Sequence, residues 1–102
     1  MSISRLSVAV LTALGLSVSA QAQDAAVPAK ASGCVSCHSA DGNPLVAGVP
    51  ILSGQRSDYL AMSLRAYRDG RRTGGGASVM ALIVEDLSDE DIEEIAQWFA
   101  QN

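Results

Sequence analysis

Histidine and cysteine are scarce in this sequence of 102 residues, which contains one histidine and two cysteines. A structural zinc site needs four ligands of these types, so the sequence cannot supply one. A thioredoxin-like dithiol is expected beside a strand–helix–strand unit, and no stretch alternates convincingly between polar and apolar residues. These absences exclude a zinc protein and a thioredoxin-like redox protein.

Basic residues and aromatic residues are also few. Seven Lys and Arg stand against eleven Asp and Glu, for a net charge of −4. An acidic chain gains nothing from counterion release on a phosphate backbone, so nucleic acid is excluded as the expected partner. Only four side chains are aromatic. A domain this small often needs a metal, disulfides or another staple, and a large apolar cofactor would fill that need.

A hydrophobic run long enough to cross a membrane is missing as well. The apolar run of residues 6–18 follows Arg5 and is interrupted by Ser and Thr, whereas a span needs about 20 apolar residues. It precedes Ala20-Gln21-Ala22, a small-x-small pattern typical of signal peptide cleavage. We expect a cleaved signal at 1–22 and one exported, periplasmic domain at 23–102, with a charge of −5 and no membrane span.

The remaining periodicity is helical. A brief helix is expected from about Pro28 into the cysteines, and the stretch that follows the turn at 41–44 reads as an irregular loop. A second helix is predicted over 58–69, with Ser57 as its N-cap and Gly70 at its C-cap. The last is predicted over 89–101, capped by Ser88. Its apolar face comprises Ile92, Ile95, Ala96 and Phe99. The fold class is all-α.

Both cysteines and the histidine fall in one stretch, "GCVSCHSADGN", residues 33–43. A disulfide between Cys34 and Cys37 is possible in an exported protein, but it would close a very small loop and leaves His38 without a role. Positions i and i+3 share one face of a helix, so both thiols can form thioethers with one haem, and His38 can reach the iron. C-x-x-C-H is the attachment signal of c-type haem, and we predict one covalent haem c here.

From these residues onward the chain resembles the small class I c-type cytochromes, especially bacterial monohaem ones and single domains of dihaem ones. The resemblance covers nearly all of 31–102. It is carried by "CVSCHSADGN", by "VPILSGQRSDYLAMSLRAYRDGRR", and by Met80 ahead of "LSDEDIEEIAQWFA". It implies the class I cytochrome c fold, with three to four short helices and long loops around the haem. It also implies that the carbonyl of Pro50, twelve residues after His38, holds the other imidazole nitrogen.

Two methionines remain after the expected leader as candidates for the second axial ligand. Met62 lies inside the predicted middle helix, where we expect it to fill the core. Met80 follows the Gly-rich segment and precedes Leu87 by seven residues, the place where the resemblance puts the axial methionine. We therefore expect His38 and Met80 as iron ligands, an arrangement that raises the redox potential.

The expected function is one-electron transfer between redox proteins of the periplasm, such as an oxidase, reductase or dehydrogenase, without enzyme activity. An alternative is the haem subunit of a periplasmic dehydrogenase. A less favoured one is a peroxidase-like or gas-binding protein, which requires an open sixth site. The arginines at 65–72 and the acidic stretch at 85–94 allow two interpretations. They form either solvated faces with helix-dipole pairing, or a dipolar surface that steers a partner.

Overall fold

The computed structural model describes residue 15 and residues 26–102, and every regular element in these residues is helical. The 3-10 turn η1 (Ala29–Ala31) leads directly into α1 (Ser32–His38). The longer helices are α2 (Ser57–Arg68), α3 (Ala77–Val84) and α4 (Asp89–Ala100). The predicted all-α class is confirmed. Apart from residue 15, the expected leader lies outside the described residues, and within them no helix is long and apolar enough to span a membrane.

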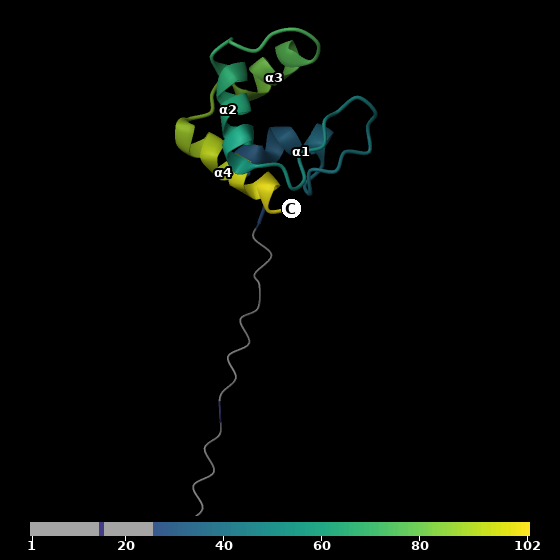
Figure 1. Cartoon of the computed structure of the whole chain (residues 1–102), viewed down its shortest axis with the longest axis vertical. Helices are drawn as coiled ribbons and strands as arrows, with labels where there is room; N and C mark the ends of the chain where they lie inside the picture. The colour runs from purple at the N-terminus through teal and green to yellow at the C-terminus, as the bar shows by residue number, and fades with distance from the viewer. Residues whose placement is uncertain (1–14, 16–25) are drawn as a thin grey trace, which may run out of the picture.

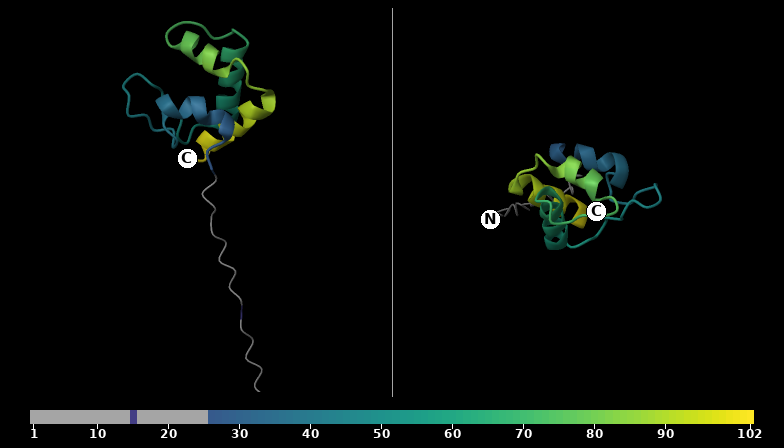
Figure 2. Two further views of the ribbon diagram at one scale, coloured as in Figure 1. Left: turned by 180° about the vertical axis from the view of Figure 1, so that it is seen from behind. Right: turned by 90° about the horizontal axis from the view of Figure 1, so that it is seen from above.

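The framework of the fold is the packing of α2 against α4, with α3 against α2 and η1 against α4. In Figure 1, α1 and α3 project on the same side of this pair, and the reversed view in Figure 2 shows the same arrangement. The loop of residues 39–56 extends beyond α1. The buried core is made by Ala31, Cys34, Leu60, Ala61, Ile92, Ile95, Ala96 and Phe99.

The last helix forms as its sequence predicts. The Ser88 hydroxyl accepts a hydrogen bond of 3.1 Å from the Asp91 backbone N–H, and the Asp91 carboxylate accepts one of 3.0 Å from the Ser88 N–H. This reciprocal capping box satisfies two of the free donors at the helix start. All four predicted apolar residues of this helix are buried, so its inner face is confirmed.

The middle helix matches its predicted span to within a residue, but its predicted N-cap is wrong. Ser57 is the first helical residue, and the N-cap is Arg56, which makes no side-chain capping bond. The other end has a Schellman motif, in which Gly70 takes a left-handed φ of 73°. The N–H of Arg71 bonds at 2.8 Å to the Ala66 carbonyl, which satisfies a carbonyl at the helix end.

One helix, α3, was not predicted. Its sequence "ASVMALIV" has no charged residue and only one polar residue, and its N-cap Gly76 offers no side chain. Ala77 and Val84, at its two ends, are buried. Met80 therefore lies on a helix that is packed at both ends, immediately after the Gly-rich loop.

Candidate functional site

A large cavity lies among the four helices. Its volume is about 700 Å³, within the range of roughly 300–1,000 Å³ typical of ligand sites. Its walls come from α1, the segment 48–55, α2, the Gly-rich segment 72–76, α3 and α4. Most of the lining is aliphatic or aromatic. The cavity thus suits a large, mainly apolar group enclosed by all four helices.

The residues of the Cys-x-x-Cys-His motif line this cavity from α1. Cys34 is buried in the core, whereas Cys37 is exposed. Burial raises the pKa of the Cys34 thiol, which keeps it protonated at neutral pH and makes it a poor redox nucleophile. Both thiols lie beside the same cavity, as attachment of one ligand through two thioethers requires.

The ring of His38 is fixed by a contact with the following loop. Ser39 takes a left-handed φ of 66°, which ends α1 and starts the loop immediately after the histidine. Nδ1 of His38 lies 2.9 Å from the carbonyl oxygen of Pro50. A carbonyl can only accept, so Nδ1 carries a proton in this contact, and Nε2 is the ring nitrogen left outside it. His38 is only 7% exposed and lines the cavity, and the contact with Pro50 holds its ring.

The two candidate methionines lie in different places. Met80 is half-buried and lines the cavity from α3. Met62 does not line it and is 56% exposed, so its prediction as a core residue is wrong. On α2, two residues from Leu60, it is turned by about 200° away from the buried face. Of the two, only Met80 shares the cavity with His38.

The sequence does not predict which polar residues line the cavity, although Arg72 belongs to the arginine group at 65–72. Tyr59, Ser63 and Tyr67 recur every four residues along α2 and form one stripe that faces the cavity. Arg72 and Gln55 line it from the loops at the two ends of that helix. The four-residue spacing of these polar side chains is the sequence signal for a shared face of α2, but apolar residues at helical spacing on the same helix make it hard to recognise.

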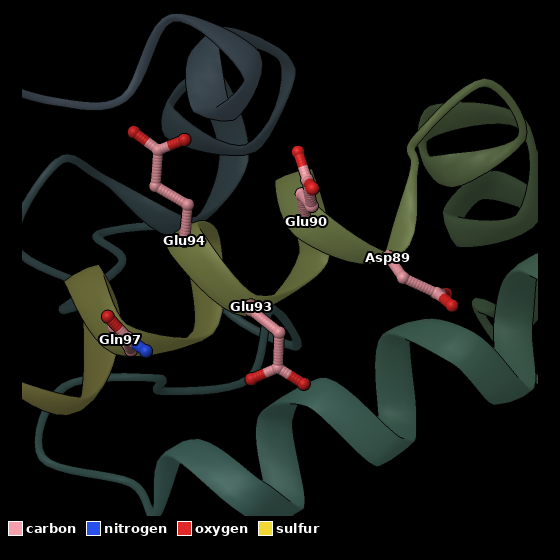
Figure 3. A pocket seen from close by; sticks show the side chains of 5 residues that line it. All are labelled: Asp89, Glu90, Glu93, Glu94 and Gln97. Carbon is pink, nitrogen blue, oxygen red and sulfur yellow. The ribbon is translucent and has the colours of Figure 1, made fainter.

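The arginines at the end of α2 and the acids of α4 largely neutralise one another. Arg65 Nη2 lies 2.6 Å from Glu93 Oε1, and Arg68 Nη1 lies 2.8 Å from Asp89 Oδ1. The bond from Arg68 lowers the pKa of the Asp89 carboxyl. Figure 3 shows Asp89 and Glu93 directed toward α2, with Glu90 on the other side of α4. These four residues form ion pairs between α2 and α4, an arrangement that neither interpretation of the sequence named.

The comparisons with known proteins agree with this chemistry. Residues 22–102 match the family model described as Cytochrome c. Cytochrome c-554(548) of Halomonas halodenitrificans is 48% identical over 67 residues, which cover 66% of this chain and 81% of that protein. Cytochrome c4 of Pseudomonas aeruginosa is 40% identical over 98 residues, covering 94% of this chain and 47% of that protein.

A third relative carries a functional name. The protein called thiosulfate dehydrogenase electron acceptor in Stutzerimonas stutzeri is 36% identical over 67 residues, covering 66% of this chain and 31% of that protein. The chain therefore spans less than half the length of this relative and of cytochrome c4.

Proposed function

The chain belongs to the cytochrome c family, and from that premise we propose that it shuttles single electrons between proteins of the periplasm. Its cofactor is haem c, and the cavity fits this group in size, in apolar lining and in its pair of thiols. Bound haem supplies the exchange of one electron between ferric and ferrous iron. Every other requirement falls on the protein, which must hold, orient and shield the group.

Attachment and orientation are assigned to the first helix and the loop after it. In the proposal, Cys34 and Cys37 would hold the haem through two thioethers, and Nε2 of His38 would bind the iron. The 2.9 Å bond from Nδ1 to Pro50 supports this role. It selects the tautomer with a free Nε2, keeps the ring in one orientation, and raises its basicity as a ligand.

Met80 is the residue that would supply the other protein ligand of the iron. Its thioether would close the sixth coordination site, and a soft sulfur ligand favours reduced iron and so raises the potential. A closed site leaves no place for a substrate to bind the metal. The presence of Met80 in the cavity that also contains His38 supports a carrier over a catalyst.

The sequence of the leader and the name of one relative support the proposed periplasmic location and the proposed class of partner. The sequence of residues 1–22 predicts a cleaved export signal. The relative named as an electron acceptor of thiosulfate dehydrogenase supports a dehydrogenase as electron donor, and an oxidase or reductase would receive the electron. This name equally favours the second candidate, a haem subunit that stays bound to its dehydrogenase.

One observation carries the proposal: both cysteines, the histidine and Met80 line one cavity of about 700 Å³. The test begins with the protein exported by a bacterial host that matures c-type cytochromes. Its intact mass after acid–acetone extraction should equal residues 23–102 plus one haem. A reversible one-electron titration and no binding of carbon monoxide are expected.

Four results would contradict parts of this proposal. Haem lost on extraction rules out the thioethers, and a mass that includes residues 1–22 rules out cleavage. Rapid binding of carbon monoxide by the untreated ferrous protein would mean an open sixth site and an enzyme or a sensor. Co-purification with a larger flavoprotein chain would instead favour the dehydrogenase subunit.

A further inference from the structure

Charge is distributed very unevenly around the cavity. No Asp or Glu lines it among the described residues, and besides His38 its single ionisable nitrogen group belongs to Arg72. Most of the other polar lining residues lie along α2 or just beyond its ends, as Arg72 does. A ligand in this cavity therefore meets a cation at only one place, near the end of α2.

The Arg72 side chain is held in position by its neighbours. Its guanidinium carbon lies 4.6 Å from the centre of the Tyr67 ring, a cation–π contact. Its backbone N–H bonds at 3.1 Å to the Ala66 carbonyl, so the residue is anchored to the Schellman end of α2. None of the ion pairs among residues 26–102 includes Arg72. Its charge is available to a ligand.

Arg71, next in the chain, provides the contrast. It carries the same charge, but it does not line the cavity, and its Nη2 lies 3.4 Å from the Asp69 carboxylate. The two adjacent arginines therefore differ in their surroundings. Arg72 lines the cavity and contacts the Tyr67 ring, whereas Arg71 lies outside the cavity and is paired with Asp69.

We propose that Arg72, held by the Tyr67 ring, pairs with a carboxylate group of the bound haem. This inference rests on the proposed function. Haem has two carboxylates on the edge away from its two vinyl groups, and attachment of the vinyl groups to Cys34 and Cys37 fixes which edge faces α1. Arg72 is exposed although it lines the cavity, and its planar guanidinium matches a carboxylate with paired hydrogen bonds. Arg72 is a positioning residue and takes no part in electron exchange.

The pairing has an electrostatic consequence. A cation paired with the haem disfavours the extra positive charge of the ferric state, so its removal should lower the midpoint potential. Exposed charges that act from a distance are screened within about 30 Å at 0.01 M salt and about 3 Å at 1 M. Arg72 itself is exposed, but a haem carboxylate in direct contact with it would be partly buried against the Tyr67 ring, and partly buried pairs are screened much less. Salt therefore separates a contact role of Arg72 from a general effect of surface charge.

The experiment measures the midpoint potential of the exported holoprotein at 0.01 M and 1 M salt. Arg72→Gln should lower the potential at both salt concentrations and shift the infrared carboxylate band of the haem. Arg71→Gln, the matched control, should lower it only at low salt and leave the band unchanged. Arg72→Lys should retain most of the wild-type potential. Tyr67→Leu, which keeps the charge but removes the ring, should give a smaller shift in the same direction.

Equal shifts for both glutamine variants that vanish at 1 M salt, with an unchanged carboxylate band, would overturn the pairing. If Arg72→Gln fails to mature, the Arg72→Lys and Tyr67→Leu variants test the pairing instead. A Tyr67→Leu variant with the potential and the carboxylate band of the wild type would contradict the pairing of Arg72 with the haem carboxylate. The proposed function is tested separately, because it fails only if the wild type lacks covalent haem or a reversible couple.

Discussion

Arg68, the last residue of α2, donates a hydrogen bond of 3.1 Å from Nη1 to the carbonyl oxygen of Leu87, nineteen residues further along the chain. The same nitrogen lies 2.8 Å from the Asp89 carboxylate. Leu87 stands in the short turn between α3 and α4. One guanidinium therefore fixes the end of α2 to the junction that follows the Met80-bearing helix.

The first prediction concerns this junction. Arg68→Gln should lower the thermal unfolding midpoint more than Arg71→Gln does, because it removes a bond to a main-chain carbonyl as well as an ion pair. The Arg68 side chain is 21% exposed and that of Arg71 is 61% exposed, so only the first loses packing as well. Thermal unfolding followed by far-UV circular dichroism compares the two. Equal midpoints would show that the contact with Leu87 adds nothing to stability.

The second prediction concerns Gly42, where the loop after α1 folds back on itself. Its carbonyl accepts hydrogen bonds from Leu52 and Ser53, its φ is 74°, and an added Cβ would lie 2.6 Å from the Ser53 nitrogen. Gly42→Ala should therefore cost about 1–2 kcal/mol for the left-handed backbone and a further ~1–3 kcal/mol for overpacking.

Gly48 offers the matched control for this loop. Its φ is 84°, but nothing lies within 4 Å of an added Cβ, so Gly48→Ala should cost only the backbone part. Urea unfolding of the two variants measures the difference. If the two alanines cost the same, the close approach of Ser53 to Gly42 is relieved by movement of the loop.

The third prediction is a pH dependence that arises at the start of α4. The hydrogen bond from the Ser88 backbone N–H lowers the pKa of the Asp91 carboxyl. A lowered folded-state pKa stabilises the protein fully above the unfolded value of about 3.9. That contribution disappears as the pH falls through the folded-state pKa. Asp91→Asn should thus lose less stability than wild type between neutral pH and about pH 2.

Unfolding free energies measured across this pH range test the capping carboxylate. Glu90→Gln is the control, because it removes a charge from the same first turn on a side chain that points away from α2. If Glu90→Gln reduces the loss of unfolding free energy at low pH as much as Asp91→Asn does, the effect belongs to the helix dipole alone and not to the capping bond. Independently, Ser88→Ala should cost about 0.5–2 kcal/mol as a lost cap.

The sequence predicts those elements whose signals are local. The last helix has a capping residue, an acidic first turn and apolar residues at helical spacing, and its predicted inner face is buried. For α3 these signals are missing: an almost uniformly apolar octapeptide has no periodicity, and Gly76 is no side-chain cap. That helix depends on the packing of Ala77 and Val84 at its ends, which the sequence does not express.

The candidate site divides in the same way. The motif at 34–38 is local, so it can be recognised from the sequence alone. The expected hydrogen bond between His38 and Pro50 is present at 2.9 Å. The contact of Tyr67 with Arg72 depends on how the chain turns at the end of α2, so spacing alone could not reveal it. The prediction for Met62 is wrong for a different reason: methionine often fills a core, but the position of Met62 around α2 turns its side chain away from the buried face.

The last prediction assigns the sixth iron ligand. Met80 lies in the cavity with His38, on a helix packed at both ends, and a bound thioether keeps the potential high. Met80→Ala should lower the midpoint potential, remove the long-wavelength sulfur-to-iron band of the ferric protein, and let the ferrous protein bind carbon monoxide. Absorption spectra in both redox states and a potentiometric titration measure all three effects.

Met62→Ala is the matched control, since it removes the same side chain from a position outside the cavity that is 56% exposed. It should leave the band and the potential unchanged. Its cost in stability should fall below the roughly 2–5 kcal/mol of a buried methionine truncated to alanine. If Met80→Ala retains the band while Met62→Ala loses it, α2 must rearrange on haem binding and the ligand assignment is wrong. If neither change affects the spectrum, the sixth ligand is not a methionine, and the case for a dedicated electron carrier weakens with it.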